Sequence, residues 1–239
     1  MYQARTYRDW VGASGLVSFS ATTRESDLMI RARRDLRRQA ETALARVRGE
    51  IEAEIARRPE FGVSLIPLPL PPSPTPVVGG MLRAAAACGV GPMAAVAGAV
   101  AQGVGRALER WSPEVIVENG GDIYLKSARP VEIGLYAGED SPYTGRLRLR
   151  VRPAGGELGV CASSGTVGHS LSFGRSDAVV AVAQDAALAD AAATAIANRI
   201  TSPEVVERVI EEERQRGLLR GLLIVVEGRL GVVGDLELL

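Results

Sequence analysis

The stretch Ala186-Ala-Leu-Ala-Asp-Ala-Ala-Ala-Thr-Ala-Ile-Ala-Asn198 decides how this chain folds, because a helix of this composition must be enclosed by other elements. Asp190 and Thr194 lie four residues apart, so their oxygens project from one helix face. An exposed polar pair is the simpler interpretation. The surrounding alanines instead favour a buried helix, in which a carboxylate needs a partner. A carboxylate beside a hydroxyl suits a hard cation such as Mg²⁺.

A second segment, Cys161-Ala-Ser-Ser-Gly-Thr-Val-Gly-His-Ser170, precedes this helix and is rich in hydroxyls and glycines. No glycine stands two residues before Ser163 or Ser164, so the segment is not a nucleophile elbow. The lysine of a phosphate loop is also missing. We interpret the segment as a polar loop whose hydroxyls and amides surround phosphates. His169 is the only histidine of the chain, and structural and functional roles are both open for it.

A third segment, Asn119-Gly-Gly-Asp122, stands between two strand candidates. Asn-Gly is typical of a tight hairpin turn, and an aspartate adds a side-chain cap. The two glycines would also let a ligand reach the backbone, where their amides can bind an anion. Both interpretations can hold together.

The composition limits the classes of protein to which the chain can belong. Its 239 residues are 46% apolar and 23% charged, which is enough for a single domain over 1–239. Six of the thirteen prolines fall in Pro67–Pro76, an extended connector that leaves two intimate subdomains as an alternative. Lys plus Arg equals Asp plus Glu, so the basic excess of a nucleic-acid binder is missing.

The two cysteines are too few for a disulfide framework. Both are expected to behave as small apolar residues, with Cys161 the better candidate for reactivity because it adjoins the polar loop. The first residues lack the apolar run of a secretory signal. The Ala- and Gly-rich stretch Ala84–Val104 is interpreted as a closely packed core helix. We therefore expect a cytoplasmic protein with no membrane partner.

Runs of neighbouring strands flanked by helices predict an α+β fold with a mostly antiparallel or mixed sheet. An amphipathic helix follows a hairpin within Trp10–Ala32, and Pro59 ends it. The other expected helices are Gly80–Ala87, Pro92–Trp111, Ala186–Asn198 and Pro203–Arg216. The other expected strands are Val115–Val117, Ile123–Leu125, Val131–Tyr136, Leu147–Val151, Gly159–Ala162, Ala178–Ala183, Leu222–Glu227 and Leu230–Leu239.

The order of these segments resembles the FAD:protein FMN transferase superfamily, once assigned to thiamine biosynthesis. That family has a Gly-Ala-rich helix, a Gly-Gly-Asp turn, a Ser-Gly turn, a histidine segment and an Asp-Ala-x-Ala-Thr-Ala helix. The matching residues here are Gly120-Gly121-Asp122, Ser164-Gly165, His169 and, as the most specific match, Asp190-Ala-Ala-Ala-Thr194-Ala195. The resemblance spans roughly Gly91–Asn198. The pattern Ser163-Ser-Gly-Thr-Val-Gly-His-Ser-Leu-Ser-Phe-Gly174 is typical of a divergent, uncharacterised branch of the superfamily.

The resemblance implies a site as well as a fold. Asp190 and Thr194 would be Mg²⁺ ligands, and the ion would engage the pyrophosphate of FAD while FMN passes to a protein acceptor. His169 would serve catalysis at the dinucleotide site. The remaining cofactor-binding positions are Asn119, Gly120, Gly121, Asp122, Ser163, Ser164, Gly165 and Thr166.

Two hypotheses of function follow. The first is an Mg²⁺-dependent transferase that binds or acts on a flavin dinucleotide. The second is a noncatalytic or accessory protein of the same fold, linked to sulfide assimilation and homocysteine formation by resemblance to relatives in that branch. It is motivated by Cys161, by the missing Asp-Pro after His169, and by Ala97 where the family has a lysine. A flavin or nucleotide is the expected small-molecule partner, and a homodimer is left open.

Overall fold

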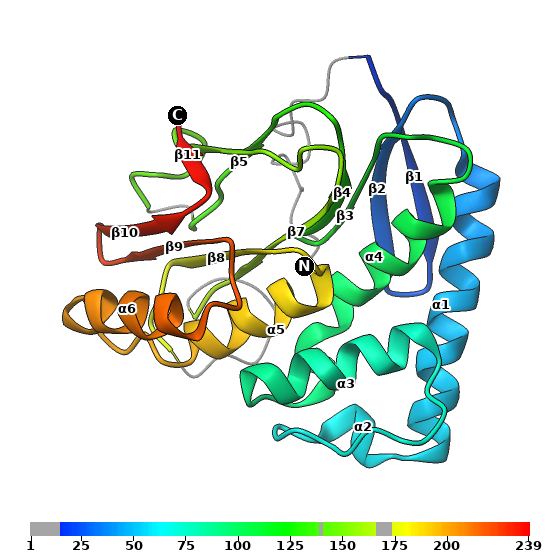
Figure 1. The fold of residues 1–239 in the computed structure, drawn as a ribbon, viewed down its shortest axis with the longest axis horizontal. Helices are drawn as coiled ribbons and strands as arrows, with labels where there is room; N and C mark the ends of the chain where they lie inside the picture. Colours follow the sequence, from blue (N-terminus) through cyan, green and yellow to red (C-terminus); the bar gives the residue numbers. More distant parts are fainter. Residues whose placement is uncertain (1–14, 139–140, 166–173) are drawn as a thin grey trace.

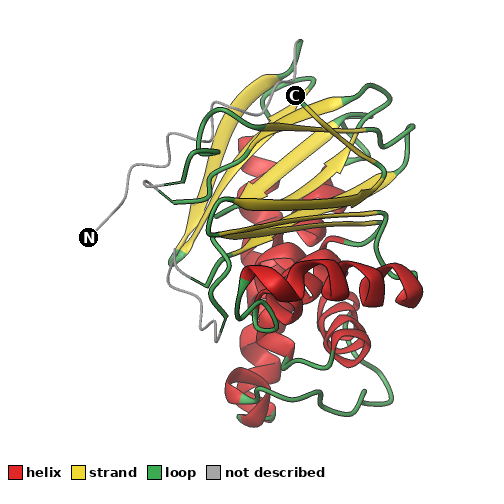
Figure 2. Ribbon diagram, turned by 90° about the vertical axis from the view of Figure 1, so that its left-hand side faces the viewer, coloured by secondary structure: helices red, strands yellow, loops and turns green. Residues whose placement is uncertain are grey.

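The computed structural model describes residues 15–138, 141–165 and 174–239 and arranges them in three layers. A large antiparallel sheet forms the middle layer, helices cover one of its faces, and a small sheet covers part of the other (Figure 2). The α+β class with antiparallel strands, predicted from the sequence, is confirmed.

The large sheet has eight strands in the order β1-β2-β3-β4-β7-β8-β9-β10. All seven of its pairings are antiparallel. Its strands are β1 (Val17–Thr23), β2 (Ser26–Ala32), β3 (Val115–Asn119), β4 (Asp122–Lys126), β7 (Glu157–Ser163), β8 (Ala178–Ala183), β9 (Gly221–Val226) and β10 (Arg229–Gly234). The small sheet has the order β11-β6-β5, with β5 (Val131–Gly134), β6 (Arg148–Val151) and β11 (Leu236–Leu238).

The central strands are apolar on both faces because both faces are covered. All six residues of β8 are buried, and so are all six of β9. Alternate side chains point to opposite faces. Thus Val180 and Val182 pack toward the small sheet, while Val179 and Ala181 pack toward the helices.

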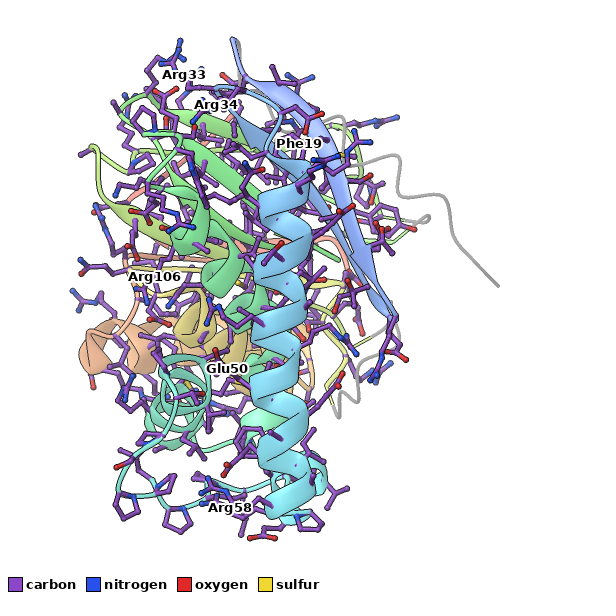
Figure 3. The ribbon with its side chains drawn as sticks, turned by 90° about the vertical axis from the view of Figure 1, so that its right-hand side faces the viewer. Phe19, Arg33, Arg34, Glu50, Arg58 and Arg106 are labelled. Carbon is purple, nitrogen blue, oxygen red and sulfur yellow. The ribbon has the colours of Figure 1, made fainter. Side chains whose placement is uncertain are left out.

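The helical layer is built from long and short helices on one face of the large sheet (Figure 1). They are α1 (Arg37–Arg57), α2 (Glu60–Val63), α3 (Pro76–Cys88), η2 (Pro92–Ala95), α4 (Val96–Leu108), α5 (Ala186–Ala197), η3 (Pro203–Val205) and α6 (Val206–Arg216). Figure 3 shows α1 along the side of the molecule, where Phe19 of β1 joins the core beneath it. The alanine-rich α5 lies inside this layer, as the sequence predicts, with ten of its twelve residues buried.

Small residues let α4 and α5 lie close to the sheet. A Cβ added at Gly105 of α4 would lie 2.1 Å from the ring of Tyr124. A Cβ added at Gly159 of β7 would lie 2.3 Å from the Cα of Ala186, at the start of α5. The glycines therefore decide how deeply both helices sit.

Several element boundaries differ from the sequence predictions, and three of the differences change how whole elements begin, divide or pair. The helix expected at Gly80–Ala87 begins earlier, because Pro76 occupies its first turn. The helix expected at Pro92–Trp111 is divided into η2 and α4 and ends at Leu108. The single strand expected at Leu230–Leu239 is interrupted at Gly234, whose φ of 88° turns the chain out of the large sheet so that β11 pairs with β6.

Among the described residues, no one helix has both the length and the apolar character needed to cross a bilayer. The pair Pro76–Cys88 and Pro92–Leu108 meets those criteria only when taken together, and it is bent by 107°.

Candidate functional site

A cavity of about 300 Å³ opens where α4 and α5 meet the ends of β4 and β7. We call it the α4–α5 cavity. Its polar wall contains Asp122, Ser163, Asp190, Thr194 and Asn198. Its apolar wall comes from the end of α2 and the segment after it, from the segment after α3, from η2 and from the first residues of α4. These residues are Val63, Leu65, Val90, Met93, Ala94, Val96 and Ala97. The cavity thus offers oxygen ligands on one side and an apolar surface on the other.

Asp190 reaches the cavity from the inner face of α5 and is 8% exposed. Its Oδ2 accepts a hydrogen bond from the amide of Gly98 at 2.9 Å. Gly98 is the third residue of α4, so its N–H has no partner within the helix, and Asp190 caps α4 from a distant part of the chain. Burial raises the pKa of Asp190 to about 7, against the lowering effect of the Gly98 and Ala97 amides.

Asp122 is the first residue of β4 and is also 8% exposed. Its buried Oδ1 has no hydrogen-bond partner among the described residues. Burial raises the pKa of Asp122 well above its usual range, and the negative charge of Asp190 raises it further. The neighbouring Cys161 thiol and the backbone of Ala162 lower the pKa of Asp122 only in part. Two buried carboxylates therefore share one site with too little positive charge.

The donor set of the cavity fits Mg²⁺. Two carboxylates and the hydroxyl of Thr194 are hard oxygen ligands, and Mg²⁺ is usually bound by one or two carboxylates plus waters and substrate phosphates. No cluster of three or more His, Cys, Asp or Glu side chains suited to a metal occurs within the described ranges. The side chains would thus supply part of a coordination shell, and a phosphorylated ligand or water the rest. A cation would also give the unpartnered Asp122 oxygen its missing contact.

The turn after β3 has the hairpin geometry expected from its sequence. Gly120 and Gly121 have φ values of 67° and 108°, which favour glycine. The amide of Gly121 donates to Glu118 Oε1 at 3.0 Å, so it is used inside the turn. Asn119 Nδ2 donates to the carbonyl of Ala97 at 3.1 Å and ties the turn to α4. Of the four residues from Asn119 to Asp122, only Asp122 lines the cavity, and the cofactor-binding role of the others stays a prediction.

Only part of the hydroxyl-rich segment that begins at Cys161 is seen to reach the same cavity among the described residues. Ser163 lines the cavity, whereas the Ser164 hydroxyl donates to the carbonyl of Ser176 at 3.3 Å. The Gly165 amide also donates to Ser176, at 2.8 Å. Thr166 and His169 lie outside the described residues, so their roles stay predictions.

Cys161 lies beneath the carboxylates and is fully buried. Its Sγ donates to the carbonyl of Ala186 at 3.3 Å. Burial, together with the charges of Asp122 and Asp190, raises the pKa of this thiol well above its usual range. A reactive cysteine needs exposure and a lowered pKa, so the geometry does not favour the reactivity expected for Cys161.

Sequence reasoning missed two parts of the site. The end of α2 and the segment after it contribute Val63 and Leu65 to the cavity, and no motif there signals that role. Gln102, buried at the contact of α4 with α5, was also missed. Its signal was present, because Gln102 is an uncharged polar residue in a helix whose other residues, apart from Arg106, are apolar.

The whole architecture matches solved structures of flavin transferases. The flavin transferase ApbE from Vibrio cholerae gives a TM-score of 0.61 at 13% identity, covering 92% of this chain and 97% of that one. The flavinyl transferase ApbE of Pseudomonas stutzeri gives 0.60 at 12% identity, with 91% and 94% covered. At such low identity the likeness establishes the fold alone. The class of protein is therefore an α+β protein with the ApbE flavin-transferase fold.

Sequence comparison then places the chain more closely. A UPF0280 protein of Methanocella arvoryzae is 44% identical over 191 residues, which cover 80% of this chain and 74% of the relative. A UPF0280 protein of Methanopyrus kandleri is 42% identical over 199 residues, covering 82% and 79%. The family model described as AbpE bacteria matches residues 8–229. The chain belongs to this family, as the resemblance of its motifs predicted.

Proposed function

We propose that this protein is an Mg²⁺-dependent transferase that binds FAD and passes its FMN half to a hydroxyl of an acceptor protein. The observation that carries the proposal is the α4–α5 cavity, in which Asp122, Asp190 and Thr194 converge from a strand and a helix. The unpartnered Oδ1 of Asp122 and the mutual repulsion of the two carboxylates support a cation between them. The fold shared with flavin transferases supports the flavin.

Each wall of the cavity has a role in this proposal. Asp122, Asp190 and Thr194 would hold Mg²⁺, which when bound neutralises charge that develops on the pyrophosphate. The Gly98 amide fixes one oxygen of Asp190, so the carboxylate needs little reorganisation to bind. The apolar wall, which includes Val63 and Met93, would contact the apolar part of the bound flavin.

The transfer would exchange one phosphorus–oxygen bond for another. The acceptor oxygen bonds to the FMN phosphorus as the pyrophosphate P–O bond breaks. AMP leaves with the bonding electron pair, and the hydroxyl proton is released. The catalytic role of His169 in this step stays a prediction.

The test is to incubate the purified protein with FAD, Mg²⁺ and candidate acceptor proteins, and to measure AMP and covalently bound flavin. The expected result is a release of AMP that requires Mg²⁺ and is lost in Asp190→Asn. Asp235→Asn is the matched control, because Asp235 is three-quarters exposed and pairs with Arg220 away from the cavity. The proposal would be contradicted if the protein neither released AMP nor bound FAD.

A second function, flavin or nucleotide binding without transfer, is favoured by one observation. Among the described residues that line the cavity there is no Lys or Arg to neutralise a leaving phosphate. Calorimetric binding of FAD with Mg²⁺ but no AMP with any acceptor would identify this accessory role. A thiol role in sulfide assimilation is tested separately, because Cys161→Ser would then abolish sulfide-dependent growth.

A further inference from the structure

Two hydrogen-bonded bridges join α4 to α5. Gln102 Oε1 accepts from the amide of Ala186 at 2.6 Å, and its Nε2 donates to Asp185 Oδ2 at 2.9 Å. Four residues earlier on α4, the Gly98 amide donates to Asp190, four residues later on α5. The bridges therefore set an antiparallel register between the two helices.

The side chain of Gln102 has no freedom to turn over. It is 6% exposed, and its oxygen must face the Ala186 N–H while its NH₂ group must face a carboxylate. Ala186 is the first residue of α5, so its N–H lacks a partner within the helix. Asp185 also caps α5, because its Oδ1 accepts from the Leu188 amide at 3.1 Å. A buried amide whose oxygen and nitrogen are both hydrogen-bonded in this way specifies one arrangement.

Close packing prevents α5 from moving nearer to α4 and β7. A Cβ at Gly98 would lie 2.2 Å from the carbonyl oxygen of Ala186 and 2.9 Å from Cβ of Asp190. A Cβ at Gly159 would lie 2.3 Å from the Cα of Ala186. The backbone of Ala186 is thus in contact on two sides. The Gln102 bonds keep it from moving away, and Asp190 follows one helical turn later.

We infer that Gln102 is a positioning residue that sets the register of α5 against α4 and so holds the Asp190 carboxylate at the α4–α5 cavity. Gln102 does not line the cavity, so it acts through the first turn of α5. For its effect on a bound cation the inference rests on the proposed function. For the placement of Asp190 against Gly98 it stands on the geometry alone.

The experiment exchanges the polarity of the bridge. Gln102→Glu places a carboxylate against Asp185, and Asp185→Asn places a second NH₂ group against Gln102. The double variant restores a donor facing an acceptor, because the introduced asparagine would donate to the introduced glutamate while its oxygen still accepts from the Leu188 amide. Net charge is the same in the double variant and the native protein. Gln102→Met, which keeps the length but forms no hydrogen bond, replaces Gln102→Glu if that variant does not fold.

Two readouts are compared: the hydrogen-exchange protection of the Gly98 amide relative to that of Val180 in β8, and the Kd for Mn²⁺. Each single variant should lose Gly98 protection relative to Val180. Each should also bind Mn²⁺ roughly tenfold more weakly, a typical effect of losing a group that orients a metal ligand. The double variant should recover both. Val209→Ala, a truncation on the buried face of α6, controls for general loss of stability.

The inference is overturned if the single variants lower the relative exchange protection of the Gly98 amide no more than Val209→Ala does. It is also overturned if the double variant recovers neither that protection nor the affinity for Mn²⁺. Failure of the native protein to bind Mn²⁺ would instead contradict the proposed function. In that case the hydrogen-exchange protection of the Gly98 amide relative to Val180 still tests whether Gln102 positions α5.

Discussion

The buried carboxylates of Asp122 and Asp190 lower the stability of the protein when no ligand is bound. Burying a carboxylate is unfavourable unless hydrogen bonds or an opposite charge compensate it. Asp190 is partly compensated by Gly98, but Asp122 lies beside a second acid and keeps one oxygen unpartnered among the described residues. Such a placement is typical of a site selected for binding rather than for stability.

Asp122→Asn should therefore separate stability from binding. Removing the charge should raise the free energy of unfolding of the metal-free protein by about 1 kcal/mol at pH 7, because a buried like-charge contact disappears. The same change should weaken binding of Mg²⁺ or Mn²⁺ by at least roughly tenfold, since one ligand loses its charge. Urea denaturation and calorimetry measure the two effects. A stable variant that binds the ion normally would exclude Asp122 as a ligand.

At the scale of elements, α4 determines the site because it contacts the sheet, α1 and α5 together. Its buried face includes several glycines and alanines, and the glycine at Gly105 allows the ring of Tyr124 to approach the helix backbone. Its end is held by Glu109, which accepts hydrogen bonds from Tyr124 and Lys126 of β4. Changes at either point should move α4 relative to the cavity.

Gly105→Ala should lower the free energy of unfolding by roughly 1–3 kcal/mol, because the added methyl group overpacks the contact with Tyr124. Gly80→Ala on α3 is the matched control. A Cβ there meets nothing within 4 Å, so the higher helix propensity of alanine should stabilise the protein by roughly 0.5–1 kcal/mol. Urea denaturation measures both, and equal effects at the two glycines would contradict the role given to Gly105.

Glu109 should make stability depend on pH. Burial raises its pKa, but the hydrogen bonds from Lys126 and Tyr124 outweigh burial and hold the pKa below its usual value. The stabilisation is therefore present above the unfolded pKa and is lost as pH falls through the lower folded pKa. Glu109→Gln should cost about 1 kcal/mol at pH 7 and progressively less below about pH 4. A cost that is the same at about pH 3 and pH 7 would contradict this assignment.

For the whole molecule, one chain crossing joins the two sheets near the C-terminus. Gly234 ends β10, and the Asp235 amide donates to the carbonyl of Arg220 as the chain turns toward β6. A Cβ at Gly234 would lie 2.2 Å from that same carbonyl oxygen, at a φ of 88°. The last strand, β11, can therefore turn away from β10 and pair with β6 in the small sheet only if this position is glycine.

Gly234→Ala should destabilise the protein by about 2 kcal/mol or more, because strain in φ adds to the contact with Arg220. Gly217→Ala, which ends α6 at a φ of 66° with no atom within 4 Å, should cost only about 1 kcal/mol. Thermal unfolding of the two variants provides the comparison. A smaller loss at Gly234 than at Gly217 would show that the crossing does not require glycine.

The features that could be predicted from sequence are those encoded by neighbouring residues. Periodicity and alanine content predict a buried helix at Ala186–Asn198 with Asp190 and Thr194 on one face, and turn chemistry predicts the hairpin at Asn119–Asp122. The motif order further indicated the family. These properties depend on local backbone preference and side-chain pattern, which the chain contains before it folds.

Only the tertiary structure decided which of these segments meet. Asp122 comes from β4, Asp190 from α5 and Leu65 from the segment after α2, and no local signal predicts their shared cavity. The role of Gln102 likewise follows from where α4 lies against α5. The physical reason is that such contacts depend on packing distances between elements far apart in the chain, which the glycines at Gly98 and Gly159 set and which sequence periodicity does not contain.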